Sequence, residues 1–315
     1  MGQIDRALSN GVCVSAWTFD ELYGRDGKFL KGLESLGQVF VGEIPSDFHG
    51  WSRKPKVLDE GPETTGPGRP KEYPRLAQGY HSSEVRNLAQ YSPLFRKQSW
   101  QPYRIKDTDK GPEVWEVKWA PFWRKGEEGL PTRRHCLIVA RNVLTGEVKY
   151  FLANRVPGEK NPVTGQWIAL RWLLRVAFGR CSIESCFREG KEELGLDHYE
   201  VRGWRCVHRH FYVTGLSHLF CARIRQEYDN SPGEGADRIS VEQVRSAMNV
   251  WLDAADLPTA VRRQRFEDEL ENQQYYQRRS RQARQSHTKT RLARLAALGI
   301  DVTRIKSCLH ERAGP

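Results

Sequence analysis

The segment from Phe178 to Arg202 carries the sequence pattern around which the rest of the chain can be interpreted. Ser182 belongs to the residue types that cap helix N-termini, and Gly195 to those that end helices. We therefore predict a helix from Ser182 through Leu194. Three apolar residues recur at helical spacing and form its expected buried face: Ile183, Phe187 and Leu194.

A second stripe of this predicted helix is polar and consists of Arg180, Glu184, Arg188 and Lys191. From Glu184 onward these side chains share one face, because residues three and four apart are neighbours on a helix. A carboxylate there could hold a divalent metal, and the cations could hold the phosphates on which the metal acts. The alternative is a solvated face with ion pairs between neighbouring turns.

The amino-acid sequence of this stretch resembles the C-terminal signature of DDE transposases of bacterial insertion sequences, in the subgroup with a Tyr-Arg-Glu-Lys pattern. In that pattern an Arg precedes the catalytic Glu by four residues and a Lys follows it by seven, as Arg180, Glu184 and Lys191 do here. The Tyr position is Ala177 in this chain, with Phe178 beside it. The resemblance implies that Glu184 is catalytic and binds metal, and that Arg180, Lys191 and Arg188 bind DNA phosphates. Glu189, Glu192 and Glu193 are the alternative acids in the same helix.

The sequence of the N-terminal region predicts a β-α-β unit with an acidic residue at the carboxyl end of its first strand. The apolar run Val12–Phe19 predicts a buried strand, and Gln38–Ile44 predicts a second one. Between them, Asp26 is the expected cap of a helix over Gly27–Leu36. Asp20 follows the first strand, at the carboxyl end where open α/β sheets bind ligands.

The phrase FDELYG at Phe19–Gly24 resembles the second catalytic Asp motif of the same family. The resemblance implies that Asp20 is a catalytic carboxylate and a metal ligand. The alternative is that Asp20 only caps the turn that follows it.

The resemblance implies a ribonuclease-H-like sheet on which three carboxylates hold two Mg²⁺ or Mn²⁺ ions for in-line displacement at phosphorus. The first carboxylate of the family lies well before the second Asp, whereas nineteen residues precede Asp20 here and Asp5 falls in a predicted helix. We therefore expect an N-terminally truncated transposase that binds metal weakly and cleaves DNA at a rate near background.

The middle of the chain predicts antiparallel strands. Val114–Ala120 alternates, with Trp115, Val117 and Trp119 on one face, and a turn with Asn142 and Gly146 joins two further strands. The predicted fold is mixed α/β, with a ribonuclease-H-like core, a β-rich insertion and a C-terminal basic helical region. The expected segments are a first core part (1–50), a linker (51–80), the insertion (81–160), a second core part with the Glu184 helix (161–228) and the basic region (229–315).

Several helices are expected in the C-terminal half. A capping box of Ser240 and Gln243 predicts a helix to about Leu252. Another is expected over Val201–Arg225, with an inner face of Val207, Phe211, Leu216, Leu219 and Phe220. This segment also carries Cys206, His208, His210 and His218; zinc binding is the disfavoured alternative, because alternate residues lie on different faces of a helix.

The tail has a strong positive charge. No acid occurs between Asn272 and Ile300, and the cations assigned to DNA are Arg278, Arg279, Arg281, Arg284, Lys289 and Arg291. Tyr275 and Tyr276 stand just before them. Such density suits phosphate contacts, and the alternative is a solvated basic tail without a partner.

The composition favours a nucleic-acid partner over a membrane surface, because the 315-residue chain carries a net charge of +11. Seven cysteines without a CxxC pair indicate reduced thiols, and no signal peptide is evident. We expect a cytoplasmic, nucleoid-associated bacterial protein that binds element ends and target DNA, with homodimerisation as an open option. The rival functions are a non-catalytic DNA-binding remnant of a transposase and a single-metal nuclease using Asp20 and Glu184.

Overall fold

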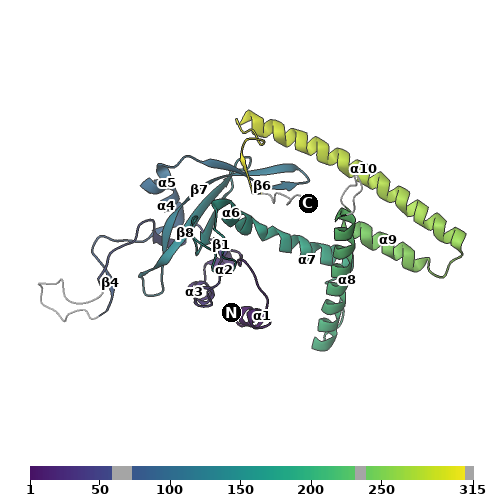
Figure 1. Cartoon of the computed structure of the whole chain (residues 1–315), viewed down its shortest axis with the longest axis horizontal. Helices are drawn as coiled ribbons and strands as arrows, with labels where there is room; N and C mark the ends of the chain where they lie inside the picture. The colour runs from purple at the N-terminus through teal and green to yellow at the C-terminus, as the bar shows by residue number, and fades with distance from the viewer. Residues whose placement is uncertain (59–72, 231–238, 309–315) are drawn as a thin grey trace, which may run out of the picture. The chain divides into compact units, whose positions relative to one another are not determined.

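The computed structural model describes residues 1–58, 73–230 and 239–308 and forms two compact units. The first comprises residues 1–180 and 287–315, and the second comprises residues 181–286. The second unit is therefore an insertion in the sequence of the first (Figure 1). None of the described helices is both long enough and apolar enough to cross a bilayer.

The first unit is built on a mostly antiparallel sheet. Its strands are β1 (Val41–Ile44), β2 (His49–Trp51), β5 (Ser83–Glu84), β6 (Gln101–Thr108), β7 (Gly111–Lys125), β8 (Pro131–Asn142), β9 (Val148–Ala153) and β10 (Lys306–Ser307). The order is β1-β9-β8-β7-β2-β5, with β6 also on β7 and β10 on β6; among these described strands the β10–β6 pairing is parallel and the others are antiparallel. Two short strands, β3 (Val57–Leu58) and β4 (Arg75–Leu76), form a separate pair.

Helices pack on both faces of this sheet. They are α1 (Gly2–Ser9), α2 (Glu21–Gly24), α3 (Gly27–Ser35), α4 (Val85–Tyr91), α5 (Pro93–Arg96) and α6 (Leu170–Gly179); the end of α10 (Thr259–Ala297) bonds to the β6–β7 turn. Leu173 and Leu174 of α6 share one core with Ile138 of β8, whereas Leu30 of α3 and Phe95 of α5 share another with Leu137. Because both faces are covered, β8 reads as a continuous apolar run.

The expected β patterns of the middle segment are confirmed. Trp115 and Val117 lie in one core and Trp119 packs against it. Asn142 Oδ1 accepts hydrogen bonds from the Leu144 and Thr145 amides, at 2.9 and 3.1 Å, and Gly146 has a φ of 74° that favours glycine. The mixed α/β class is confirmed, but β1 pairs with β9 and β2 with β7, so the expected first core part and insertion share one sheet.

The strand expected at Val12–Phe19 was wrong. Only Trp17 makes a bridge, in parallel with Phe40, and Val12 is 46% exposed. The end of the run does bond to the next segment: the Trp17 amide donates to the Val39 carbonyl oxygen, and the Val41 and Glu43 amides donate to the Trp17 and Phe19 carbonyl oxygens. Residues 12–16 have no such neighbouring strand among the described residues and are irregular. The helix after Asp26 is confirmed as α3, with the Asp26 carboxylate accepting from the Lys28 and Phe29 amides.

A buried ionic cluster lies between α3 and the sheet. Glu34 Oε1 is 2.7 Å from His135 Nε2, and Glu34 Oε2 is 3.7 Å from the Arg124 guanidinium. The other ring nitrogen of His135 is 2.7 Å from the Arg133 carbonyl oxygen. Burial alone would raise the pKa of Glu34, but the hydrogen bond and charge of His135, with Arg124 and Arg133, hold it below its ordinary value.

The second unit is helical, with α7 (Cys181–Leu194), α8 (Trp204–Asn230), α9 (Val241–Asp253) and most of α10. The capping box is confirmed: Ser240 Oγ accepts from the Gln243 amide and the Gln243 side chain accepts from the Ser240 amide. The unit's small core contains Cys221, Val241 and Val244.

Two predicted inner faces of this unit were wrong. Ile183 and Phe187 of α7 are 49% and 54% exposed, although Leu194 packs against the core. On α8, four of the five residues expected inside are at least 44% exposed: Phe211, Leu216, Leu219 and Phe220. Helical spacing gives the apolar face of a helix, but burial of that face needs a partner element.

The last part of α10 belongs to the first unit. Arg291 donates hydrogen bonds of 3.1 Å to Thr108 Oγ1 and to the Gly111 carbonyl oxygen, at the β6–β7 turn. Beyond α10, β10 pairs with β6, and the Cys308 amide donates to the Arg104 carbonyl oxygen at 2.8 Å. The expected basic region from 229 to 315 is thus divided between the two units.

Candidate functional site

Asp20 caps the short helix α2. Its Oδ1 accepts from the Leu22 amide at 3.1 Å and from the Tyr23 amide at 3.4 Å. This is the structural role that the sequence left as the alternative to catalysis. It does not use the whole carboxylate, because Oδ2 of Asp20 makes no hydrogen bond among the described residues.

The turn that carries Asp20 is fixed against β1. The Glu43 amide donates to the Phe19 carbonyl oxygen at 3.0 Å, directly before Asp20. A β-carbon on Gly24 would lie 1.9 Å from the Glu43 carbonyl oxygen, so only glycine allows α2 to approach β1 this closely. The motif FDELYG therefore has a physical basis. Asp20 caps helix α2, and Gly24 allows this helix to pack closely against strand β1.

Two charged residues that the sequence interpretation missed lie beside this turn. Lys149 Nζ of β9 is 2.9 Å from Glu43 Oε1 of β1. Burial alone would lower the pKa of Lys149, but the hydrogen bond and charge of Glu43 raise it, and the charge of Arg180 opposes that rise. Arg180, at the end of α6, therefore lies near the paired strands β1 and β9. The turn that carries Asp20 is hydrogen-bonded to the same strand β1. A lone Glu within the apolar segment Gln38–Ile44 was the available sequence signal.

Glu184, Arg188 and Lys191 lie on α7 in the second unit, and Glu184 is exposed in its first turn. Arg188 Nε is 4.0 Å from Glu192 Oε2, with both side chains more than 60% exposed, so this ion pair contributes little stability. The other alternative acids also have partners: Glu189 pairs with His218 at 3.5 Å and Glu193 with Arg245 at 3.2 Å. The expected Ser182 cap lies outside the described side chains.

Carboxylates are the correct ligands for Mg²⁺ or Mn²⁺, and Asp20 Oδ2 and the exposed Glu184 fit that chemistry. Within residues 1–58, 73–230 and 239–308, no three His, Cys, Asp or Glu side chains gather in a cluster suited to a metal. Asp20 belongs to the first unit and Glu184 to the second, so their convergence remains a prediction.

The histidines of α8 have individual partners rather than a shared centre. His208 lies 4.0 Å from the Trp204 ring, and His210 Nε2 is 2.9 Å from the Gly195 carbonyl oxygen. His218 lies between Cys186 Sγ, 3.6 Å from its Nδ1, and Glu189. These contacts support structural roles within the helical unit.

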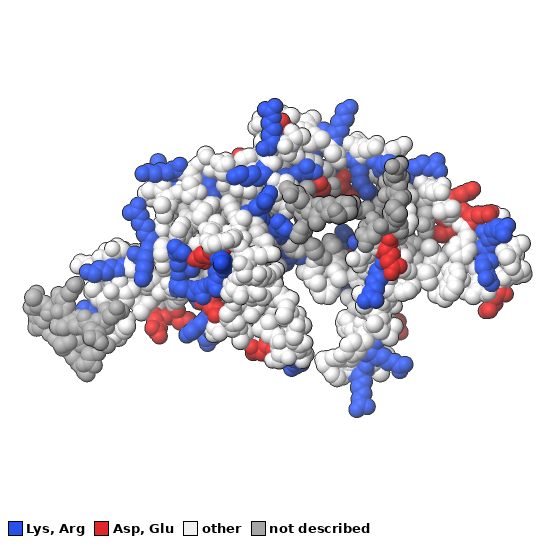
Figure 2. Space-filling model, viewed as in Figure 1, with Lys and Arg blue, Asp and Glu red and all other residues white. Residues whose placement is uncertain are grey.

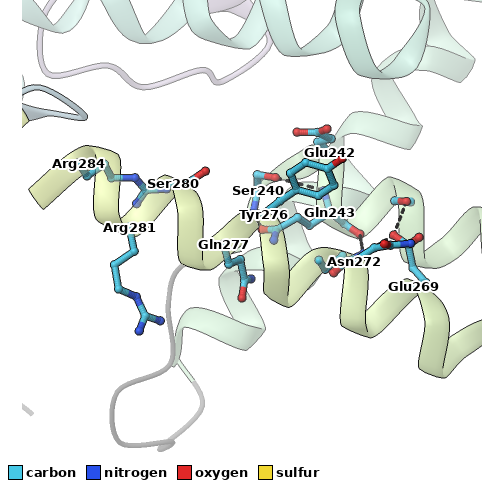
Figure 3. A pocket seen from close by; sticks show the side chains of 12 residues that line it. Ser240, Glu242, Gln243, Glu269, Asn272, Tyr276, Gln277, Ser280, Arg281 and Arg284 are labelled. Carbon is cyan, nitrogen blue, oxygen red and sulfur yellow. Dashed lines mark hydrogen bonds between the residues drawn. The ribbon is translucent and has the colours of Figure 1, made fainter. Parts of the chain in front are cut away.

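The basic stretch of α10 continues as a helix and presents its cations on more than one face. Arg279 lies over the Tyr275 ring at 5.8 Å and donates to its hydroxyl at 3.1 Å. Arg281 and Arg284 line a groove between α9 and α10 (Figure 3). Lys289 is exposed, whereas Arg291 is half-buried at the β6–β7 turn, a structural role that the sequence interpretation did not include. In Figure 2, Lys and Arg side chains are spread over the visible face, with acidic side chains between them.

Comparison with known families matches residues 1–112 to the DDE superfamily endonuclease family, which supports a relationship to DDE transposases. The matched segment contains Asp20 and Gly24 but ends before Arg180 and Glu184. No curated protein matches the chain.

Proposed function

We propose that the chain is a DDE-type transposase of a bacterial insertion sequence, acting in DNA strand cleavage and transfer. The observation that carries the proposal is the DDE endonuclease match over residues 1–112. In this segment Asp20 directly follows Phe19, whose carbonyl oxygen accepts a hydrogen bond from the Glu43 amide of β1. The spacing of Arg180, Glu184 and Lys191 gives independent support. A ribonuclease-H-like core, element ends and target DNA as substrates, and a homodimer are parts of this proposal.

In this proposal Asp20 and Glu184 hold the Mg²⁺ or Mn²⁺ ions, which would activate the attacking oxygen and stabilise the leaving one. The chain's own cations position the DNA. Arg180, near the β1–β9 pair, binds a phosphate beside the scissile bond, and Lys191 and Arg188 hold neighbouring phosphates. Because these three cations also oppose metal binding, we expect weak metal affinity and slow turnover.

Iron-directed cleavage of the polypeptide tests the metal site without requiring turnover. With Fe²⁺, ascorbate and peroxide, a bound ion produces hydroxyl radicals that cut the backbone nearby. We expect cuts near Asp20 and near Glu184 that excess Mg²⁺ suppresses. Asp20→Asn and Glu184→Gln should each remove both sets of cuts, because the two side chains share the site.

The control for this mapping is Glu21→Gln, which removes an exposed acid next to Asp20. It should leave the pattern unchanged. Cuts at one position that persist when the other acid is replaced would refute a shared site. Metal-dependent nicking of DNA that disappears in Glu184→Gln would establish the enzyme directly and refute the expectation of background turnover.

A non-catalytic DNA-binding remnant is the second candidate, favoured by the use of Asp20 as a helix cap. It predicts no localised iron cuts but retains DNA binding. The single-metal nuclease predicts the same iron-directed cuts near Asp20 and Glu184, but with one bound ion instead of two. Two carboxylates hold two hard cations poorly.

Binding of duplex DNA should depend steeply on salt, because each phosphate neutralised by a cation releases counterions. Replacing Arg278, Arg279, Arg281 and Arg284 by alanine should lower the slope of log affinity against log salt by about 0.9 for each phosphate that the variant no longer neutralises. Fluorescence anisotropy at several salt concentrations measures this slope.

The matched control replaces the exposed Arg263 and Arg265, which precede the acid-free stretch of the same helix. The control removes two positive charges and the test variant four, so an equal change of slope for each arginine replaced would show that net charge alone is responsible. Deletion of the tail is a poor test, since it also removes β10 from the sheet of the first unit.

A further inference from the structure

A polar groove of about 480 Å³ runs between α9 and α10 within the second unit. On α10 its lining residues recur at intervals of three and four from Glu269 to Arg284, so they form one continuous face of the helix. The N-terminal turns of α9 supply the opposite wall, which includes Gln243 (Figure 3).

The chemistry of this lining is unusual for a face between two helices, because none of the described residues that line it has an aliphatic side chain. Its central part carries the amides of Asn272, Gln273 and Gln277, with the Tyr276 ring 66% exposed. Faces that serve only for helix packing are normally apolar. Amides, hydroxyls and an exposed ring instead suit a polar ligand with flat groups.

The two ends of the groove differ in charge. Glu269 lies at one end, where Oε1 accepts hydrogen bonds from Ser246 at 2.6 Å and from Gln273 at 2.8 Å. Arg281 and Arg284 lie at the other end. Twelve helical residues separate Glu269 from Arg281, which corresponds to about 18 Å along α10. Glu242 of α9 adds a second carboxylate to the lining (Figure 3), so an anionic group is favoured at the arginine end only.

We infer that this groove binds single-stranded DNA, an inference that rests on the proposed function and specifies its substrate. Arg281 and Arg284 hold backbone phosphates, Tyr276 stacks on a base, and the amides bond to base edges. In a duplex the bases are already paired and stacked, so a duplex can offer the two arginines its phosphates but cannot offer Tyr276 and the amides its base faces and edges. Only an unpaired strand can bring its bases into contact with Tyr276 and the amide side chains that line the groove.

A second aromatic ring, Tyr275, lies beside Tyr276 but outside the groove, with its plane at 76° to that of Tyr276. The ring centroids of Tyr275 and Tyr276 are 5.4 Å apart, and Arg279 lies over the far ring. Tyr275 and the adjacent Arg278 and Arg279 do not line the groove. This arrangement gives a comparison of two neighbouring arginine pairs on one helix, one inside the groove and one outside.

The experiment measures binding of a labelled ten-nucleotide single strand to the whole chain by anisotropy, in EDTA so that no cleavage occurs. We expect Arg281→Ala with Arg284→Ala to weaken binding at least tenfold more than Arg278→Ala with Arg279→Ala, although both variants lose the same charge. Tyr276→Ala should weaken it roughly tenfold, and Tyr276→Phe should bind like the parent chain.

Equal losses for the two arginine pairs, or tighter binding of the matching duplex, would overturn the inference in favour of diffuse electrostatic attraction. Tighter binding of an RNA strand of the same sequence would overturn the choice of DNA. If the groove fails while iron-directed cuts at Asp20 and Glu184 are found, only the groove is rejected. If both fail, the proposed function is rejected as well.

Discussion

Replacing Glu34 by glutamine should lower the free energy of unfolding by about 3 kcal/mol at pH 7, because it leaves the buried Arg124 guanidinium without its carboxylate. The His135 side chain, which is fully buried, keeps a hydrogen-bond acceptor in this variant but loses the neighbouring charge. Urea denaturation followed by tryptophan fluorescence measures the loss. The matched control is Glu147→Gln, whose carboxylate is 54% exposed and 3.7 Å from Lys149. It should change stability by less than about 0.5 kcal/mol.

The same replacement should change the acid dependence of stability. Since the pKa of Glu34 is lower in the folded state, its contribution is fully present above the unfolded pKa of about 4.3 and is lost as the pH falls through the folded value. The difference between the parent chain and Glu34→Gln should therefore shrink as the pH is lowered below about 4. A difference that stays constant down to pH 3 would show that packing, rather than charge, is responsible.

Gly24→Ala should destabilise the first unit by about 2–3 kcal/mol and displace the Asp20 turn. The new β-carbon would lie 1.9 Å from a backbone oxygen of β1, which cannot rotate away, so α2 or the strand must move. Thermal unfolding measures the loss of stability, and the iron-directed cuts near Asp20 should weaken in parallel. The iron-directed cuts thereby test whether the metal-binding position of Asp20 depends on the packing of Gly24 against Glu43.

Gly179→Ala is the control for this substitution, because it also lies in a helix of the first unit but has no atom within 4 Å of the new β-carbon. Alanine favours helices over glycine by up to about 1 kcal/mol, so this variant should be unchanged or slightly more stable. A comparable loss in both variants would mean that backbone flexibility, not the contact with Glu43, makes Gly24 necessary.

The features that the sequence predicted correctly are those set by neighbouring residues. The capping box of Ser240 and Gln243, the Asp26 cap and the turn at Asn142 and Gly146 each depend on fewer than six consecutive positions. Their hydrogen bonds close locally, so the remainder of the chain has little influence on them. The alternating faces of β7 were predicted for the same reason, since the period of a strand is fixed by its backbone.

The failures concern partners distant in sequence. Val12–Phe19 is apolar enough for a strand, but only Trp17 bridges to Phe40. Leu216 and Phe220 have the spacing of a buried face, yet no described element of their own unit covers them. Periodicity states which residues would be buried together, and it does not state what buries them.

The candidate site shows the same division. Asp20 was predicted through a short motif, and its role as a helix cap closes within three positions, whereas Gly24 of the same motif packs against Glu43 of β1. The Glu43–Lys149 pair joins residues 106 positions apart and depends on the pairing of β1 with β9, which no local pattern indicates. Arg291 was assigned to DNA from its charge, and its bonds to Thr108 and Gly111 span about 180 positions.

The short strand β10 has a consequence for the solubility of the protein. Without it, the eight-residue strand β6 would expose at the edge of the sheet those amides and carbonyls that point away from β7, the kind of template on which chains associate into aggregates. Lys306 and Ser307 cover part of that edge, and the Arg291 bonds at the β6–β7 turn fix the helix that delivers them. Resistance to intermolecular β-pairing in the first unit therefore depends on a segment that the chain supplies only after the whole of the second unit.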